Sequence, residues 1–259
     1  MSMKPNYGID APDLVKAFFV TATVALVLLV VAIATNVPNG WLGLVVKSVL
    51  AVAGFYTLGM GTFMTNYSRN VKVHDREQLL SLLDFKTVRR VLDIGCGRGL
   101  MMVGAAKRTP HVSAVEIDLW LEQDQAENRP DAALENARLE GVRGQVEVQT
   151  ADMRKLPFPN DSFDGVVSHW AVHNVEELSG REVACQDIYR VFRPGGALVL
   201  ADISNHTEYT ETLRQIGFIN VRIVGDNWKT ALFSAISFGS FKPMAVYGEK
   251  RLDVSPGDA

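Results

Sequence analysis

The stretch Val91-Leu92-Asp93-Ile94-Gly95-Cys96-Gly97-Arg98-Gly99 decides the fold of this chain. An apolar run with one acid ends in three glycines at alternate positions, and the apolar segment 100–103 follows at once. This order predicts a buried strand, a tight turn and the start of a helix. Glycines suit such a turn because they adopt positive φ angles and let the backbone approach a bound cofactor, while the helix N-terminus presents free N–H groups.

An acid also follows the next expected strand. Residues 112–117 form a largely apolar run that ends at Asp118, nineteen residues after Gly99. In a doubly wound nucleotide-binding sheet, a carboxylate at about this distance binds the hydroxyls of a ribose. We therefore predict that Asp118 binds a ribose; the alternative is a solvated loop acid.

The glycine spacing separates two classes of cofactor. Dinucleotide enzymes carry G-x-G-x-x-G, whereas this chain has acid-x-G-x-G-x-G. The pattern resembles the first motif of class I S-adenosylmethionine-dependent methyltransferases. Further segments follow in that family's order, namely Thr150-Ala151-Asp152-Met153, Leu156-Pro157-Phe158, 162–168 and 190–196. The resemblance covers about residues 77–250 and is to the family's small-molecule branch.

The resemblance implies S-adenosyl-L-methionine as the cofactor. The binding residues that it implies are Asp93, Gly95, Cys96, Gly97, Gly99, Asp118, Leu119, Asp152, Met153 and Ser168. Asp93 and the glycine turn would hold the methionine end, which Ser168 would line. Asp118 would take the ribose hydroxyls. Asp152 would accept from the adenine amino group, with Met153 on the ring or simply in the core.

The resemblance also implies an α/β fold. Its doubly wound, Rossmann-like sheet has seven mostly parallel strands in the order 3-2-1-4-5-7-6. After the first strand, we expect strands near 112–117, 145–150, 163–168, 196–202, 219–224 and 244–249. Ligands bind such sheets beyond the carboxyl ends of the strands. The polar insertion 120–129 would then cover the adenosine or form a solvated loop.

The amino-terminal part predicts a two-helix transmembrane hairpin over residues 17–66. Residues 17–46 carry no charge, and the run 17–35 would span about 28 Å as a helix, close to the thickness of a bilayer core. The second apolar stretch, 41–64, is interrupted by Lys47, which would reach the headgroups or face the partner helix. Three glycines, Gly54, Gly59 and Gly61, predict close helix packing.

Three alternatives to the hairpin are a cleaved signal peptide, a single span followed by an interfacial segment, and a water-soluble helical cap. Lysines and arginines flank the hairpin at both ends but not at its tip, so both ends are expected on the cytoplasmic side. The chain then divides into a segment 1–16, the hairpin (about 17–36 and 41–64), a linker 67–76, a methyltransferase domain 77–250 and a tail 251–259.

Candidate catalytic residues follow the fourth and fifth strands. His169 and His173 are four residues apart, a spacing that predicts one shared helix face. Histidine is the side chain best suited to proton transfer near neutral pH. Asp202 ends the fifth strand, with His206 and Tyr209 just beyond it. The alternative is that these histidines only bond to the backbone or contact the substrate.

The composition narrows the possible partners. The net charge of −3 gives no electrostatic footprint for nucleic acid. The two cysteines, Cys96 and Cys185, lie far apart and indicate neither a metal site nor a disulfide framework. The aromatic and apolar region 227–241 would form a pocket wall, a surface for the bilayer or the hairpin, or ordinary core.

The sequence thus predicts a membrane-anchored methyltransferase acting on a small or lipophilic acceptor by in-line displacement. We expect the bilayer as a partner, and neither nucleic acid nor metal. The alternatives are a protein methyltransferase acting on a membrane-associated partner, a non-catalytic cofactor-binding scaffold and, last, an NAD-dependent oxidoreductase.

Overall fold

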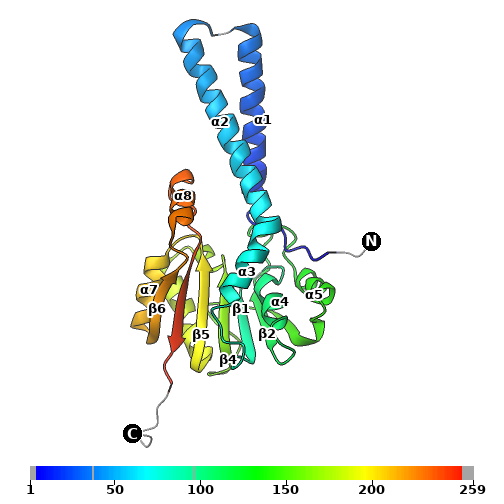
Figure 1. Ribbon diagram of the computed structural model, residues 1–259, viewed down its shortest axis with the longest axis vertical. Coiled ribbons are helices and arrows are strands. Elements are labelled where there is room, and N and C mark those ends of the chain that lie inside the picture. The colour runs from blue at the N-terminus through cyan, green and yellow to red at the C-terminus, as the bar shows by residue number, and fades with distance from the viewer. Residues whose placement is uncertain (1–3, 37, 96, 253–259) are drawn as a thin grey trace, which may run out of the picture. The chain divides into compact units, whose positions relative to one another are not determined.

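The computed structural model describes residues 4–36, 38–95 and 97–252. They divide into two compact units: residues 4–7, 73–120 and 129–252 form the sheet unit, and residues 8–72 with 121–128 form the hairpin unit. The sheet unit holds a seven-stranded sheet in the order β3-β2-β1-β4-β5-β7-β6 (Figure 1). This is the predicted order, so the predicted fold class of the sheet unit is confirmed.

The strands lie close to their predicted positions. They are β1 (Arg90–Ile94), β2 (Ser113–Asp118), β3 (Val146–Thr150), β4 (Phe163–His169), β5 (Phe192–Asp202), β6 (Phe218–Val224) and β7 (Met244–Lys250). The strand β7 runs antiparallel to both of its neighbours, β5 and β6. The strand β5 begins earlier than predicted because Phe192 already pairs with Phe163, ahead of a register shift.

Helices cover both faces of the sheet. They are α3 (Lys72–Leu80), α4 (Leu100–Ala106), α5 (Pro130–Leu139), α6 (Leu178–Val191), α7 (His206–Gln215) and α8 (Trp228–Ile236), with short 3-10 turns η2 (Arg143–Gln145) and η3 (Val172–Asn174). One apolar core packs α3, α4 and α5 against the sheet, and a second core packs α6 and α7 against it. Burial on two faces explains why the residues of β1 from Val91 to Ile94 are all buried and, apart from Asp93, apolar.

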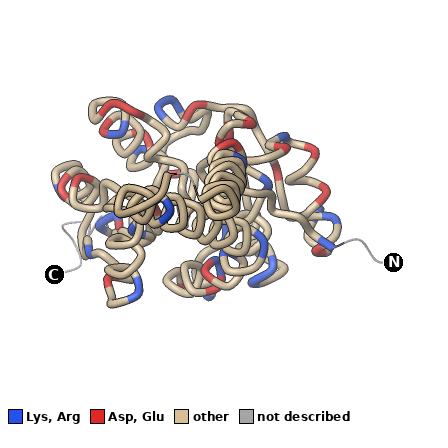
Figure 2. Tube along the Cα trace, turned by 90° about the horizontal axis from the view of Figure 1, so that it is seen from above, with Lys and Arg blue, Asp and Glu red and all other residues tan. Residues whose placement is uncertain are grey.

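The topology puts a binding edge in the middle of the sheet. The strand β1 pairs in parallel with both β2 and β4, so the chain changes direction across the sheet between β1 and β4. Open α/β sheets bind ligands at such a switch point, beyond the carboxyl ends of the strands. Acidic and basic residues are interspersed along the chain (Figure 2).

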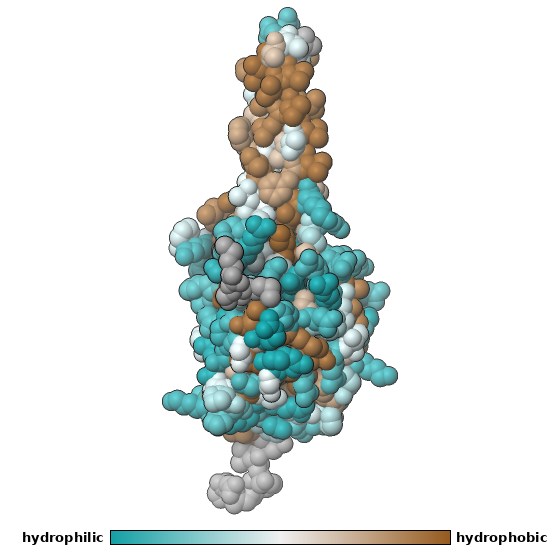
Figure 3. Space-filling model, turned by 90° about the vertical axis from the view of Figure 1, so that its right-hand side faces the viewer, coloured by the Kyte–Doolittle hydropathy of each residue, from teal (hydrophilic) through white to brown (hydrophobic). Residues whose placement is uncertain are grey.

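The hairpin unit contains two long apolar helices, α1 (Pro12–Thr35) and α2 (Gly40–Asn66), followed by the π-helical turn η1 (Tyr67–Val71). By length and composition, α1 and the continuous helical stretch Gly40–Leu80 are able to cross a membrane. Few of their side chains are buried, and the surface of the hairpin is mostly hydrophobic (Figure 3). A helix that is apolar all round and exposed suits a lipid environment better than water.

Two of the three predicted glycines lie at the interface between α1 and α2. A Cβ atom on Gly54 would come within 2.7 Å of Leu26, and one on Gly61 within 3.2 Å of Phe19. The prediction was wrong for Gly59, where a Cβ atom would meet nothing within 4 Å. Lys47 Nζ donates to Asn36 Oδ1 at 3.2 Å, so this cation reaches towards the hairpin tip.

A polar cluster closes the hairpin unit at its base, and we call it the clasp. Asp10 accepts from Lys72 Nζ at 2.9 Å, from Ser68 Oγ at 3.0 Å and from Gln125 Nε2 at 2.8 Å. The ammonium of Lys72 is almost fully buried. The insertion 121–128 is not a purely solvated loop, because backbone pairs join it to residues 9–11.

Candidate active site

The glycine turn folds as three left-handed positions in alternation. Gly95, Gly97 and Gly99 have φ angles of 64°, 62° and 80°, a region that L side chains rarely adopt. Gly95 N–H donates to Ile117 O at 2.8 Å, which ties the turn to β2. Gly99 is the N-cap of α4. The remaining predicted residue of the turn, Cys96, lies outside the described residues.

Asp93 is fully buried directly before the turn. Its Oδ2 atom accepts from the N–H of Met102 at 2.7 Å, in the first turn of α4. A carboxylate at a helix N-terminus satisfies an N–H group that has no partner within the helix and is favoured by the helix dipole. Asp93 therefore fixes the angle between β1 and α4, and with it the position of the glycine turn.

Asp118 ends β2 next to the glycine turn. Its carboxylate accepts from Gly97 N–H at 2.9 Å and from Trp120 N–H at 2.6 Å. The side chain of Leu119 is half exposed at the same edge. Each oxygen of an ionised carboxylate has two lone pairs, so Asp118 is able to accept further hydrogen bonds from a diol. The predicted ribose acid and the predicted glycine turn are thus in direct contact.

Asp152 follows β3 and carries a bidentate ion pair with Arg154, whose Nε lies 3.0 Å from Oδ1. The hydrogen bonds from the Arg154 guanidinium hold the pKa of Asp152 below its usual range. Its neighbour Met153 would lie 3.5 Å from a Cβ atom on Gly95. Asp152 is therefore an ionised acceptor, and Met153 an apolar side chain, at the edge where the glycine turn lies.

Ser168, near the end of β4, is buried, and its hydroxyl donates to Ile94 O at 2.9 Å. The bond joins β4 to β1 immediately before the turn. A Cβ atom on Gly95 would come within 2.3 Å of the Ala171 side chain, so the chain after β4 packs directly on the turn. Only glycine fits at this position, which explains why the first glycine of the motif is required.

These groups fit an adenosyl cofactor. Three left-handed glycines and a helix N-terminus lie at one edge of the sheet, and ionised or acceptor carboxylates follow the next two strands, β2 and β3. Within the described residues, His, Cys, Asp and Glu form no group of three or more placed to hold a metal ion.

His173 and Asp202 form the second part of the site. His173 Nδ1 lies 2.5 Å from Asp202 Oδ1, and the N–H of His173 donates to Oδ2 at 3.0 Å. Asp202 is fully buried, whereas the His173 side chain is 23% exposed. A carboxylate only accepts hydrogen bonds, so Nδ1 of His173 carries a proton in this contact and Nε2 is the ring nitrogen that points away from Asp202.

Further donors surround Asp202. The hydroxyl of Tyr209 donates to Oδ2 at 3.0 Å, and the N–H of Ile203 donates to Oδ1 at 2.8 Å. Nε2 of His206 donates to the Asp202 carbonyl at 3.0 Å. Burial, and then the charge of Asp202, raise the pKa of Tyr209 well above its usual value, so this tyrosine remains a neutral donor. The network stabilises the buried carboxylate and orients His173.

His169 and His173 do not share a helix face, and this prediction was wrong. His169 is the last residue of β4, whereas His173 lies in the 3-10 turn η3. Trp170 between them has a left-handed φ angle of 58°, so the chain turns there and does not form one regular element from His169 to His173. The ring of His169 stacks on Trp170 at 4.9 Å, and Trp170 packs edge to face on Phe241 at 5.3 Å. His169 therefore belongs to an aromatic cluster beside the His173–Asp202 pair.

One buried acid at this edge was missed from the sequence. Glu116 is fully buried on β2, and a Cβ atom on Gly99 would lie 3.3 Å from its Oε2 atom. Its position on the strand could have identified it. Glu116 precedes Asp118 by two residues, and side chains two residues apart lie on the same face of a strand. An acid inside an apolar strand is unusual enough to mark a site.

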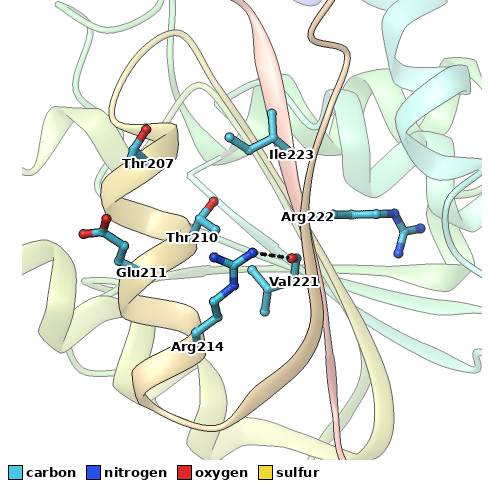
Figure 4. A pocket seen from close by; sticks show the side chains of 7 residues that line it. All are labelled: Thr207, Thr210, Glu211, Arg214, Val221, Arg222 and Ile223. Atoms are coloured by element: carbon cyan, nitrogen blue, oxygen red, sulfur yellow. Dashed lines mark hydrogen bonds between the residues drawn. The ribbon is translucent and has the colours of Figure 1, made fainter.

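A separate hollow of about 420 Å³ lies between α7 and β6. It is lined by Thr207, Thr210, Glu211, Arg214, Val221, Arg222 and Ile223 (Figure 4). The guanidinium of Arg214 reaches β6 there and donates to Val221 O at 3.0 Å. None of the predicted site residues lines this hollow, so it is distinct from the binding edge.

Known proteins resemble this chain in the segment that carries most of the site residues. Residues 92–200 match the family described as a methyltransferase domain. The chain is 33% identical over 128 residues to the methyltransferase GfsG of Streptomyces halstedii, covering 49% of this chain and 42% of that protein. It is 32% identical over 116 residues to the ubiquinone/menaquinone biosynthesis C-methyltransferase UbiE of Geotalea daltonii, covering 44% and 46%.

Among solved structures, the geranyl diphosphate C-methyltransferase of Streptomyces coelicolor A3(2) superposes with a TM-score of 0.55 at 16% identity, covering 73% of this chain and 84% of that one. This likeness concerns the fold. The chain spans less than half the length of the two curated relatives above. The matched family, the strand order and the glycine turn agree with one another: the sheet unit is a class I S-adenosylmethionine-dependent methyltransferase domain, with S-adenosylmethionine as its cofactor.

Proposed function

We propose that the protein is a membrane-anchored methyltransferase that acts on a lipophilic small molecule. The observation that carries the proposal is the presence, in one chain, of a small-molecule methyltransferase domain and two exposed apolar helices long enough to cross a bilayer. An anchor keeps the active site beside acceptors dissolved in the membrane. The names of two similar proteins agree with a lipophilic acceptor: one acts in ubiquinone and menaquinone biosynthesis and the other on geranyl diphosphate.

We assign to the cofactor residues the roles expected from the sequence. Asp118 would accept from the ribose hydroxyls, and Asp152 from the adenine amino group with Met153 against the ring. The N–H groups of the glycine turn, which Asp93 holds in place through α4, would meet the methionine end near Ser168. When bound, S-adenosylmethionine supplies a methyl group activated on a sulfonium, which an acceptor takes by in-line displacement.

His173 is the proposed general base. Asp202 holds the proton on Nδ1, which leaves Nε2 to take a proton from the acceptor, and the partial exposure of the ring leaves that nitrogen reachable. Proton transfer by a positioned side chain typically contributes about a hundredfold to ten thousandfold in rate. Such a base is useful for an acceptor with a proton to lose, namely a hydroxyl group or an acidic carbon. His169, in the aromatic cluster, would contact the acceptor.

The orientation in the membrane is part of the proposal. Lysines and arginines flank the two helices at their outer ends, at Lys4, Lys16, Arg69, Lys72 and Arg76, and the tip has none. The positive-inside rule places both ends, and the methyltransferase domain with them, on the cytoplasmic side. This is also the compartment in which the cofactor is made.

The decisive experiment is calorimetry with the full chain in detergent, followed by transfer of labelled methyl groups. We expect micromolar binding of S-adenosylmethionine and its demethylated product, none of NAD, and labelling of a compound in a total lipid extract. Labelling of a polypeptide instead would favour a protein methyltransferase. Binding without transfer to any acceptor would favour a scaffold, and release of the chain from membranes by alkaline carbonate would rule out the anchor.

A further inference from the structure

The helix α8 lies at the edge of the sheet that holds the site. The strand β6 runs parallel to β5, because both are antiparallel to β7. Val224 at the end of β6, Met244 at the start of β7 and Asp202 at the end of β5 are therefore level with one another. The segment between them, which includes α8, projects from this carboxyl edge, as its position above the strands in Figure 1 shows.

The inner side of this segment reaches the acceptor part of the site. Phe241 packs edge to face on Trp170 at 5.3 Å, and Phe233 packs on Phe241 at 6.2 Å. The N–H of Lys242 donates to Ile203 O at 2.9 Å, next to Asp202. An unbroken row of aromatic rings thus leads from α8 through Trp170 to His169, beside the His173–Asp202 pair.

The outer side of the same segment is apolar and exposed. Trp228, Leu232 and Ile236 are 71%, 47% and 45% exposed, and their spacing of four residues puts them on one helix face. Phe238, just beyond the helix, is 85% exposed with a φ angle of 52°. A left-handed conformation costs backbone energy in any residue with a side chain. The turn presents the Phe238 ring outward in spite of this cost. These four side chains form the α8 patch.

We propose that the α8 patch rests on the surface of a lipid bilayer, so that acceptors pass from the membrane along the aromatic row to His173. The inference rests on the membrane anchor of the proposed function. Trp228 at the start of α8 and the neighbouring cation Lys229 are side chains that favour the headgroup region, whereas Lys242 forms an ion pair with Asp226 at 3.2 Å. Lys229 lies over the Trp228 ring at 5.9 Å.

A bilayer is the occupant that the chemistry of this chain supports. The chain carries two apolar helices long enough to cross a membrane, and the α8 patch combines exposed apolar side chains with the neighbouring cation Lys229.

Photo-crosslinking of the full chain tests this contact directly. The chain is placed in nanodiscs of phosphatidylcholine and phosphatidylglycerol, with p-benzoyl-phenylalanine at one position at a time: Phe238 in the patch, Val27 in α1 and Leu252. Leu252 is an exposed apolar residue beyond the end of β7, at the opposite edge of the sheet, and is the matched control. We expect lipid adducts, identified by mass spectrometry, at positions 238 and 27 and at least fivefold fewer at 252.

The outcomes separate the inference from the proposed function. Adducts at 27, with no more at 238 than at 252, would overturn the contact of the α8 patch and leave the anchor standing. Adducts from 238 to protein rather than lipid would overturn it too, because a protein would then cover the patch. Absence of lipid adducts at 27 would overturn the anchor and the inference together.

A pair of variants gives a second readout. Leu232→Ser with Ile236→Ser makes the patch polar and leaves the four aromatic residues of the row unsubstituted. With a lipid extract supplied in nanodiscs, we expect the apparent KM for the acceptor to rise about tenfold, while the affinity for S-adenosylhomocysteine is unchanged. Leu252→Ser is the control and should change neither quantity. An unchanged KM in the double variant would contradict passage from the membrane along α8.

Discussion

The two halves of the candidate site are built in different ways. The cofactor half, around Gly95, Gly97 and Gly99, consists of backbone held in left-handed turns between β1 and α4. The acceptor half is made by side chains from separate strands, with His173 after β4 bonded to Asp202 at the end of β5. Damage to the first half should therefore reduce stability and cofactor binding together, whereas damage to the second should reduce transfer alone.

The largest effect is expected for His173→Ala. Loss of the general base should lower the rate of methyl transfer to a lipid-extract acceptor by about a hundredfold to ten thousandfold. The affinity for S-adenosylhomocysteine should stay within twofold, because the cofactor half is intact. A variant that keeps the wild-type rate would remove His173 from the mechanism.

The next effect, for Gly95→Ala, tests the backbone half. The new Cβ atom would lie 2.3 Å from the Ala171 side chain, at a φ angle of 64°. Left-handed strain of about 1–2 kcal/mol and overpacking of about 1–3 kcal/mol should both destabilise the fold. Gly141→Ala is the matched control, since it has a φ angle of 78° and open space. Melting temperature and cofactor binding should fall much further in Gly95→Ala; equal effects would show that the close contact is unimportant.

Asp118→Ala should weaken binding of S-adenosylmethionine well over tenfold. Two hydrogen bonds from ribose hydroxyls to a charged group contribute about 3 kcal/mol together, or roughly a hundredfold. Calorimetry measures the affinity, and Glu147→Ala, which removes an exposed acid from β3, serves as the control. Unchanged affinity in a folded Asp118→Ala protein would contradict the assignment of the ribose site.

The smallest effect is expected at the adenine end. Asp152→Ala removes one charged acceptor, and binding should weaken by about tenfold, as for a single hydrogen bond to a charged group. Arg154→Ala breaks an exposed ion pair and leaves the carboxylate in place, so affinity should change by less than about twofold. Measured by calorimetry, equal losses in both variants would show that the ion pair, rather than the carboxylate, is what the cofactor needs.

The sequence could predict the strand order, the cofactor class and the position of Asp118, because a glycine turn is a local backbone feature with a local signature. The His173–Asp202 pair is 29 residues apart and meets only because β4 and β5 are neighbours. Spacing alone therefore misled at His169, where Trp170 turns the chain, and at Gly59, which faces away from α1. The insertion 121–128 has no local signature for its bonds to residues 9–11.

The clasp has a consequence for the order of events during synthesis. Asp10 leaves the ribosome first, but its partner Lys72 lies 62 residues later and Gln125 lies 115 residues later. Both apolar helices must be made before the ion pair can form, and two strands of the sheet before the cluster is complete. The hairpin unit is thus finished only after translation of the methyltransferase domain is well under way, which links its maturation to the arrival of the domain that it carries.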